Sequence, residues 1–139
     1  MYKNNVFHFI LIALLLTAAI SACVSTKSAD MSHNARDSLD WEGRYAGRIP
    51  SASGSGIDVQ ITLRSDQTFS MVYDYVDRQG FYTGMGTFDW DETGNVIILK
   101  HPDFPPYYRV EKDRLLHLDL EGKIITGNLA DMYVLKKVE

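Results

Sequence analysis

Two histidine–aspartate pairs are the side chains best suited to hold a metal ion or to transfer a proton. His101 and Asp103 share a proline-rich segment. His117 and Asp119 are two positions apart in an expected strand, so they share a face, which we expect to be the outer one. Neither pair has the spacing of a known metal or catalytic motif, and the sequence has no nucleophile elbow, HExxH motif or paired-carboxylate constellation. We therefore expect no enzyme activity, no catalytic residue, no metal site and no cofactor.

Two other features could bind an ion. The thioethers of Met71 and Met85 could hold Cu(I), although a methionine in a core is far more common. The Gly/Ser segment from Pro50 to Gly56 could be mistaken for a phosphate-binding loop. It lacks the Gly-Lys-Ser/Thr ending, and an expected strand rather than a helix follows it. Core packing and a surface loop are the better interpretations.

The only cysteine, Cys23, ends the most specific motif in the chain. The apolar run Val6–Ile20 follows a short segment with one lysine, which is typical of a secretory signal peptide. This run is shorter than the roughly 20 residues that a membrane-spanning helix needs. Ile20-Ser21-Ala22-Cys23 fits the bacterial lipobox, which implies cleavage before Cys23 and attachment of acyl chains such as palmitate. Val24, in place of aspartate, favours the outer membrane, with the domain facing the periplasm or exposed at the cell surface.

These signals divide the chain into a signal peptide (1–22), a lipidated cysteine with a flexible tether (23–40) and one globular domain (41–139). Apolar residues make up 45% of the chain and charged residues 23%, which are ordinary values for a globular protein. The net charge is −4, and removal of Lys3 with the signal leaves 13 basic residues (14 − 1) against 18 acidic ones, or −5. Such an acidic protein has no electrostatic basis for binding nucleic acid.

The domain has the pattern of a meander of short strands. Residues 57–64 alternate apolar and polar side chains without a break, and residues 68–75 alternate again, with Phe69, Met71, Tyr73 and Tyr75 on the inner face. Turn residues occur at nearly every junction, and a meander hides its edges best by closing on itself. We therefore predict an all-β fold, a small antiparallel barrel or meander of about eight or nine strands. The expected strands are 41–49, 57–64, 68–75, 81–90, 96–99, 107–111, 115–120, 123–126 and 132–138.

One of these strands could line a ligand pocket. Tyr82, Gly84, Gly86 and Phe88 share a face of strand 81–90, and the two glycines leave space inside the barrel. A small apolar ligand could occupy this space. Large aromatic side chains from the opposite wall could equally fill it, and we favour that packing role.

Short motifs along the domain resemble the amino-terminal domain of the NlpE family. They include Trp41-x-Gly43-x-Tyr45-x-Gly47-x-x-Pro50, Ser65-Asp66-Gln67-Thr68, Gly86-Thr87-Phe88-Asp89-Trp90-Asp91, Ile125-Thr126-Gly127 and Tyr133-Val134-Leu135-Lys136-Lys137. NlpE-like proteins are outer-membrane lipoproteins linked to copper tolerance and envelope-stress signalling. Their amino-terminal domain is a small antiparallel barrel similar to lipocalins, so the resemblance implies a lipocalin-like fold and an envelope setting here.

The resemblance fails at one important place. The family commonly has a Cys-x-x-Cys motif after the first strand, and the corresponding positions here are Ser51 and Gly54. Thiolates are the soft ligands that would hold Cu(I), and neither replacement supplies one. The family's copper chemistry therefore does not carry over to this loop. Some members also have a further carboxy-terminal domain, for which this sequence shows no counterpart.

Three functions remain open from the sequence. The first, which we favour, is a non-catalytic outer-membrane lipoprotein that acts in envelope stress or homeostasis through contacts with envelope proteins. The second is a lipocalin-like carrier of a small apolar ligand. The third is a copper or metal tolerance protein with ligands other than cysteine. A closed barrel with an open apolar pocket would count against the first function and favour the second.

Overall fold

The computed structural model describes residues 33–52, 54–78 and 80–138. The predicted signal peptide, Cys23 and the predicted tether up to residue 32 lie outside these residues. Residues 33–139 form one compact unit, and every residue of the described hydrophobic core belongs to it. Within the described ranges, no helix has the length and apolar character needed to cross a membrane.

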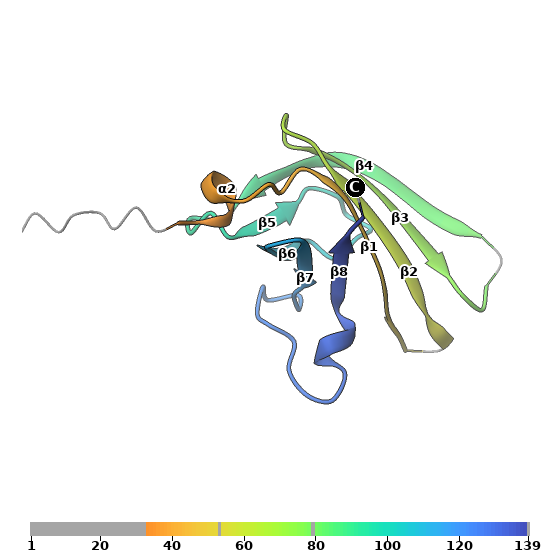
Figure 1. Cartoon of the computed structure of the whole chain (residues 1–139). Helices are drawn as coiled ribbons and strands as arrows, with labels where there is room; N and C mark the ends of the chain where they lie inside the picture. The colour runs from red at the N-terminus through yellow and green to blue at the C-terminus, as the bar shows by residue number, and fades with distance from the viewer. Residues whose placement is uncertain (1–32, 53, 79, 139) are drawn as a thin grey trace, which may run out of the picture. The chain divides into compact units, whose positions relative to one another are not determined.

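The described residues form eight antiparallel strands that close into a barrel in chain order, with β8 paired to β1 (Figure 1). This confirms the prediction of an all-β antiparallel barrel. The strands are β1 (Gly43–Ser51), β2 (Gly54–Leu63), β3 (Thr68–Tyr75), β4 (Phe81–Trp90), β5 (Val96–Leu99), β6 (Tyr107–Glu111), β7 (Arg114–His117) and β8 (Val134–Lys137). A single 3₁₀ turn, η1 (Ala130–Met132), precedes β8 in the described chain.

The predicted ninth strand, 123–126, is not a strand. Its one ladder contact is the isolated bridge between Leu118 and Ile124, made within the long connection from β7 to β8. The predicted Gly/Ser loop is also shorter than expected. Ser51 and Gly54 are register partners, so β1 and β2 form a tight hairpin with a register irregularity between Ile49 and Ser51.

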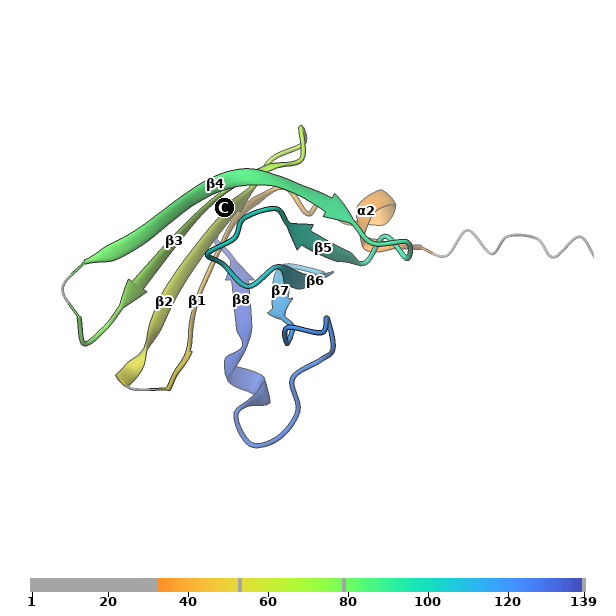
Figure 2. The same ribbon diagram turned by 180° about the vertical axis from the view of Figure 1, so that it is seen from behind.

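The two walls of the barrel differ in length. Strands β1 to β4 have eight to ten residues each, whereas β5 to β8 have four or five. The long β1–β2 and β3–β4 hairpins therefore project past the short strands at one end, as both views show (Figures 1 and 2). At that end, residues of the long strands and of the β5–β6 loop line the interior.

Alternating apolar side chains fill the other end and the middle of the barrel. In β2, Val59, Ile61 and Leu63 are at most 1% exposed, as the period of two predicts. A residue of this size contributes about 1.5–3 kcal/mol when it is fully buried. The ring of Trp41 packs edge-on against Phe88 with 5.8 Å between centroids, and it contacts Trp90 at 5.4 Å.

The compact unit that contains the barrel includes residues before the predicted domain boundary at residue 41. A short helix, α2 (Ala35–Ser38), is capped by the Asn34 side chain, which accepts a hydrogen bond from the Asp37 amide. Ala35 is 3% exposed, and its amide donates to the Asn95 side chain at 2.9 Å. Residues 33–40, which the sequence assigned to the tether, are therefore packed on the barrel at the end opposite the long hairpin tips (Figures 1 and 2).

Candidate ligand-binding cavity

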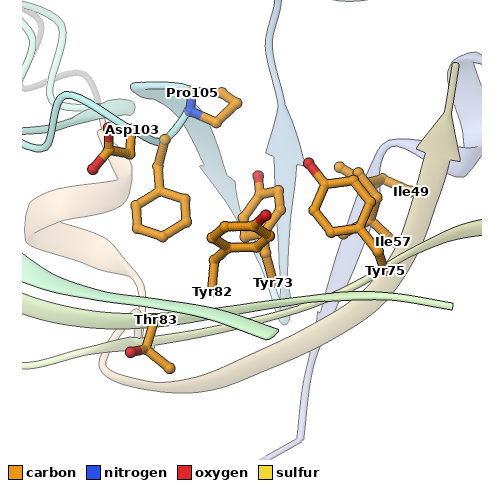
Figure 3. Close-up of a pocket in the computed structure, with 9 residues that line it drawn as sticks. Ile49, Ile57, Tyr73, Tyr75, Tyr82, Thr83, Asp103 and Pro105 are labelled. Carbon is orange, nitrogen blue, oxygen red and sulfur yellow. The ribbon is translucent and has the colours of Figure 1, made fainter. Parts of the chain in front are cut away.

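A cavity of about 670 Å³ opens at the end of the barrel where the long hairpins project. This volume lies within the range of about 300–1,000 Å³ that small-molecule sites occupy. The rings of Tyr73, Tyr75 and Tyr82 gather in the middle of the site (Figure 3). Its described lining residues are Ile49, Ile57, Tyr73, Tyr75, Tyr82, Thr83, Asp103, Phe104 and Pro105.

Strand register brings most of these residues together. Ile49 pairs with Ile57 across β1 and β2, and Ile57 pairs with Tyr75 across β2 and β3. Tyr73 pairs with Tyr82 across β3 and β4. Directly opposed residues in an antiparallel ladder point to the same face. The alternation that fills the core with Val59 and its neighbours therefore continues to the hairpin tips, where the barrel is open.

The proline-rich loop between β5 and β6 closes one side of the cavity. Phe104, at its centre, is 7% exposed and packs against Tyr73 with 5.2 Å between ring centroids. The His101 ring lies 4.8 Å from the Phe104 ring. Asp103 and Pro105, on either side of Phe104, reach the cavity mouth. The sequence showed that this segment is rich in proline but gave no sign that it would reach the cavity.

The four residues predicted to line a pocket lie at different depths. Tyr82 lines the cavity and is 62% exposed. Gly84 and Gly86 lie deeper, where a Cβ on Gly84 would meet Phe104 and a Cβ on Gly86 would come within 3.0 Å of Phe69. Phe88 is fully buried against Trp41. The space beside the two glycines is therefore occupied by aromatic rings, and the cavity begins on the hairpin side of them.

A hydrogen bond between two buried hydroxyls joins the lining residue Tyr73 to Tyr108 of β6. The Tyr73 and Tyr108 hydroxyl oxygens are 3.2 Å apart, and either can donate the hydrogen bond. Burial raises the pKa of Tyr73 and raises that of Tyr108 well above the usual value of 10. Both groups are therefore neutral hydroxyls at physiological pH.

His117 does not lie on the outer face, so that prediction was wrong. It pairs with Tyr108 across β6 and β7, and its ring stacks on Tyr133 with 5.7 Å between centroids. Both ring nitrogens are buried without a hydrogen-bond partner among the described residues. Desolvation lowers the His117 pKa to about 4, so the imidazole is neutral at pH 7. It forms no site with Asp119, whose carboxylate accepts amide hydrogen bonds from residues 121 and 123.

The side chains considered for metal binding do not converge. In the part of the chain that the structure describes, no three His, Cys, Asp or Glu residues are grouped so that they could hold an ion. Met71 is 1% exposed in the core, whereas Met85 is 78% exposed outside it. The His101 Nδ1 atom lies 3.9 Å from an Asp103 carboxylate oxygen, and no third ligand joins this described pair.

Comparison with known proteins decides the family. The model of the NlpE N-terminal domain matches residues 45–128, which span β1 to the β7–β8 connection. The chain belongs to the NlpE N-terminal domain family. This confirms the relationship indicated by the sequence motifs. No curated protein matches the chain.

Two solved structures are similar to this NlpE-family chain. A "putative lipoprotein from Shewanella oneidensis" is 39% identical, with a TM-score of 0.70, and the match covers 76% of this chain and 95% of that one. The Cpx pathway activator NlpE from Escherichia coli is 26% identical, with a TM-score of 0.51. That match covers 62% of this chain and 46% of the E. coli chain, so the similarity spans just under half of the latter.

The hairpin that replaces the family's cysteine motif lies beside the cavity. Ser51 and Gly54, which occupy the two cysteine positions, face each other at the end of the β1–β2 hairpin. The Ser55 hydroxyl donates to the Asp77 carboxylate at 3.1 Å, which ties this hairpin to the turn after β3. Hydroxyl, carboxylate and backbone groups are hard ligands, so these described residues offer nothing that would favour Cu(I).

Proposed function

We propose that this protein is a non-catalytic envelope protein whose barrel carries a small apolar ligand. The observation that supports this function best is the open cavity of about 670 Å³ in a closed barrel. Ile49, Ile57 and four aromatic rings supply most of its wall. Val76 and Phe81, beside the mouth on the β3–β4 hairpin, are 40% and 67% exposed and extend the apolar surface. Such a surface suits a ligand with an apolar chain.

The proposal includes anchoring through a lipid on Cys23 in the outer membrane. The lipobox motif supports this, as does the description of the S. oneidensis relative as a lipoprotein. The described chain starts beside α2, at the end of the barrel opposite the hairpin tips that carry the cavity (Figure 1). A chain that leads from α2 toward a membrane anchor thus starts away from the cavity mouth.

A second candidate function is signalling in envelope stress through protein contacts. It is suggested by the E. coli relative, which is described as an activator of the Cpx pathway. One observation favours a contact surface: the β7–β8 connection exposes several large apolar side chains. They are Leu120, Ile124, Leu129 and Met132, which are 78%, 53%, 52% and 46% exposed. Metal tolerance receives no support from the described residues, because their candidate ligands do not converge.

Native mass spectrometry tests the carrier function directly. Residues 24–139 would be exported to the periplasm without the lipid-bearing cysteine, purified without detergent and sprayed under native conditions. A copurifying apolar mass that is released on unfolding would support the carrier function. A bare mass, combined with no binding of any added amphiphile, would contradict it. A spectrum recorded after addition of Cu(I) would report separately on metal binding.

The anchor has its own test. Cells that express the full chain would be labelled with radioactive palmitate and then fractionated. Label on the wild-type protein in the outer-membrane fraction, and its loss in Cys23→Ser, is the expected result. Protease treatment of whole cells would then show whether the domain is surface-exposed or faces the periplasm. An unlabelled wild-type protein would contradict anchoring at Cys23.

A further inference from the structure

The cavity has walls that attract cations. Four of its described lining residues are aromatic: Tyr73, Tyr75, Tyr82 and Phe104. The face of an aromatic ring is electrically negative and attracts an ammonium or guanidinium group within about 6 Å. This protein already uses that attraction once, because the Arg78 guanidinium carbon lies 5.3 Å from the centre of the Tyr75 ring. Tyr82 is the exposed ring of the group, so it is accessible to a ligand at the mouth.

One carboxylate stands at the same mouth. Asp103 is the charged side chain among the lining residues that the structure describes, and it is 81% exposed. His101 lies beside it, with its Nδ1 atom 3.9 Å from an Asp103 carboxylate oxygen and 3.3 Å from the Asp103 amide.

The charged residues beside the other lining residues largely offset one another. Arg48 and Asp58, next to Ile49 and Ile57, pair with each other at 2.7 Å and offset one another. In the turn after β3, Asp77 and Arg78 likewise carry one charge of each sign, so Asp103 supplies the unbalanced charge among the lining residues that the structure describes. An anionic headgroup would meet net repulsion there, whereas a cationic one would be attracted.

We infer that the cavity selects cationic amphiphiles, molecules with an apolar chain and an ammonium head. The chain would lie against Ile49, Ile57 and Phe104, and the head would lie at the mouth between the Tyr82 ring and the Asp103 carboxylate. This inference rests on the proposed carrier function and adds the charge of the ligand. Both named contacts come from residues whose replacement leaves the core intact, since both side chains are largely exposed.

Three ligands with the same chain and different heads separate the two proposals. Decyltrimethylammonium, decanol and decanoate would be titrated into residues 24–139 by calorimetry, below their micelle concentrations. Amide NMR shifts at Thr83 and Asp103 would locate the bound molecule. We expect the ammonium to bind several-fold more tightly than decanoate, with decanol between them. The difference should shrink as salt is raised, because the Asp103 carboxylate is exposed.

Two substitutions test the named contacts. Asp103→Asn should weaken ammonium binding about two- to fivefold, as expected for an exposed ion pair, and should leave decanol binding unchanged. Tyr82→Leu keeps an apolar wall and removes the ring, so it should weaken ammonium binding by a similar factor. Asp131→Asn, on η1 in the β7–β8 connection, makes the same change in net charge away from the cavity and should have no effect.

The outcomes overturn the two proposals separately. Equal binding of all three ligands, or tighter binding of decanoate, would overturn the preference for cations and leave the carrier function standing. The absence of binding by all three would overturn both. An equal loss of ammonium affinity in Asp103→Asn and Asp131→Asn would show that net charge, not the cavity mouth, attracts the ligand, and would also overturn the inference.

Discussion

The Phe104 ring lies where a Cβ atom on Gly84 would have to be. The approach is well under the 3.0 Å that real Cβ contacts keep. Gly84 is an ordinary strand residue of β4 that pairs with Met71 of β3, so it is the missing side chain, and not an unusual backbone angle, that the fold requires. Because Gly84 has no side chain, Phe104 of the β5–β6 loop can pack inside the barrel and form one wall of the cavity.

Gly84→Ala should therefore destabilise the protein by about 1–3 kcal/mol, the usual cost of overpacking a filled interior. The cause can be isolated with Phe104→Ala, which removes the ring that the new methyl group would strike. In that background, Gly84→Ala should cost much less, and urea unfolding of the four proteins gives the coupling energy. Additive free energies of unfolding would mean that the two residues do not compete for the same space.

His117 makes stability depend on pH in the mildly acidic range. Its folded pKa of about 4 is below the value near 6.5 expected in the unfolded chain. The neutral ring is therefore favoured by folding, and its contribution is fully present above about pH 6.5 and is lost as the pH falls toward 4. The loss has an upper limit of about 3 kcal/mol, because one pKa unit corresponds to about 1.4 kcal/mol.

Urea unfolding of the wild type and of His117→Leu between pH 4 and 8 measures this contribution. Leucine keeps the site apolar and cannot take up a proton, so the variant should lose much less stability on acidification. His101→Gln, in the β5–β6 loop, is the matched control and should keep the wild-type pH dependence. A pH profile that is unchanged in His117→Leu would assign the effect to other groups.

The strand pattern was predictable where polar and apolar residues alternate strictly, and ambiguous where they do not. In residues 57–63 the alternation leaves one possible inner face, and the structure has that face inside. Around His117 the flanking Leu115, Leu116 and Leu118 are all apolar, so either face could be the inner one. The choice is made by the pairing of His117 with Tyr108, a contact between strands that local sequence does not encode.

The cavity was only partly predictable for the same reason. The inward positions of Ile49, Ile57 and the β3 tyrosines follow from period-two alternation. The position of Phe104 depends on how the seven-residue β5–β6 loop folds over glycines about 20 positions earlier in the chain. The helix α2 was missed because it has four residues, too few for a periodic signal, and its amide partner Asn95 is 60 positions away from Ala35.

Residues 33–40 pack on the barrel, so we predict that the stability of the domain depends on them. A chain that starts at residue 41 should be less stable than one that starts at residue 33 by about 1–3 kcal/mol, because it lacks the Asn34 cap, the Ala35–Asn95 hydrogen bond and the carbonyl of Arg36. The Trp41 indole donates to that carbonyl at 3.1 Å. Thermal unfolding of both chains measures the difference.

A point variant separates the packing of α2 from the length of the chain. Ala35→Asp places a charge at a position that is 3% exposed and should reproduce most of the loss in the longer chain. Arg36→Ala, at the next position on the surface, should have little effect. Equal melting temperatures for chains starting at residues 33 and 41 would contradict this prediction and support the domain start at residue 41 that the sequence predicted.

The buried hydroxyl pair of Tyr73 and Tyr108 should behave as a coupled unit. Removal of one hydroxyl leaves the other without this partner, so Tyr73→Phe and Tyr108→Phe should each cost about 1–3 kcal/mol. The double variant should cost clearly less than the sum, because no unpaired hydroxyl remains.

The burial of the two hydroxyls also makes stability depend on pH. The folded pKa values are raised above the unfolded value near 10, so this stabilisation is present below pH 10 and is lost as the pH rises further. Urea unfolding gives the coupling energy, and tyrosinate absorbance in an alkaline titration should show two late-ionising tyrosines fewer in the double variant. Additive costs and an unchanged titration would mean that the two hydroxyls do not form this bond in solution.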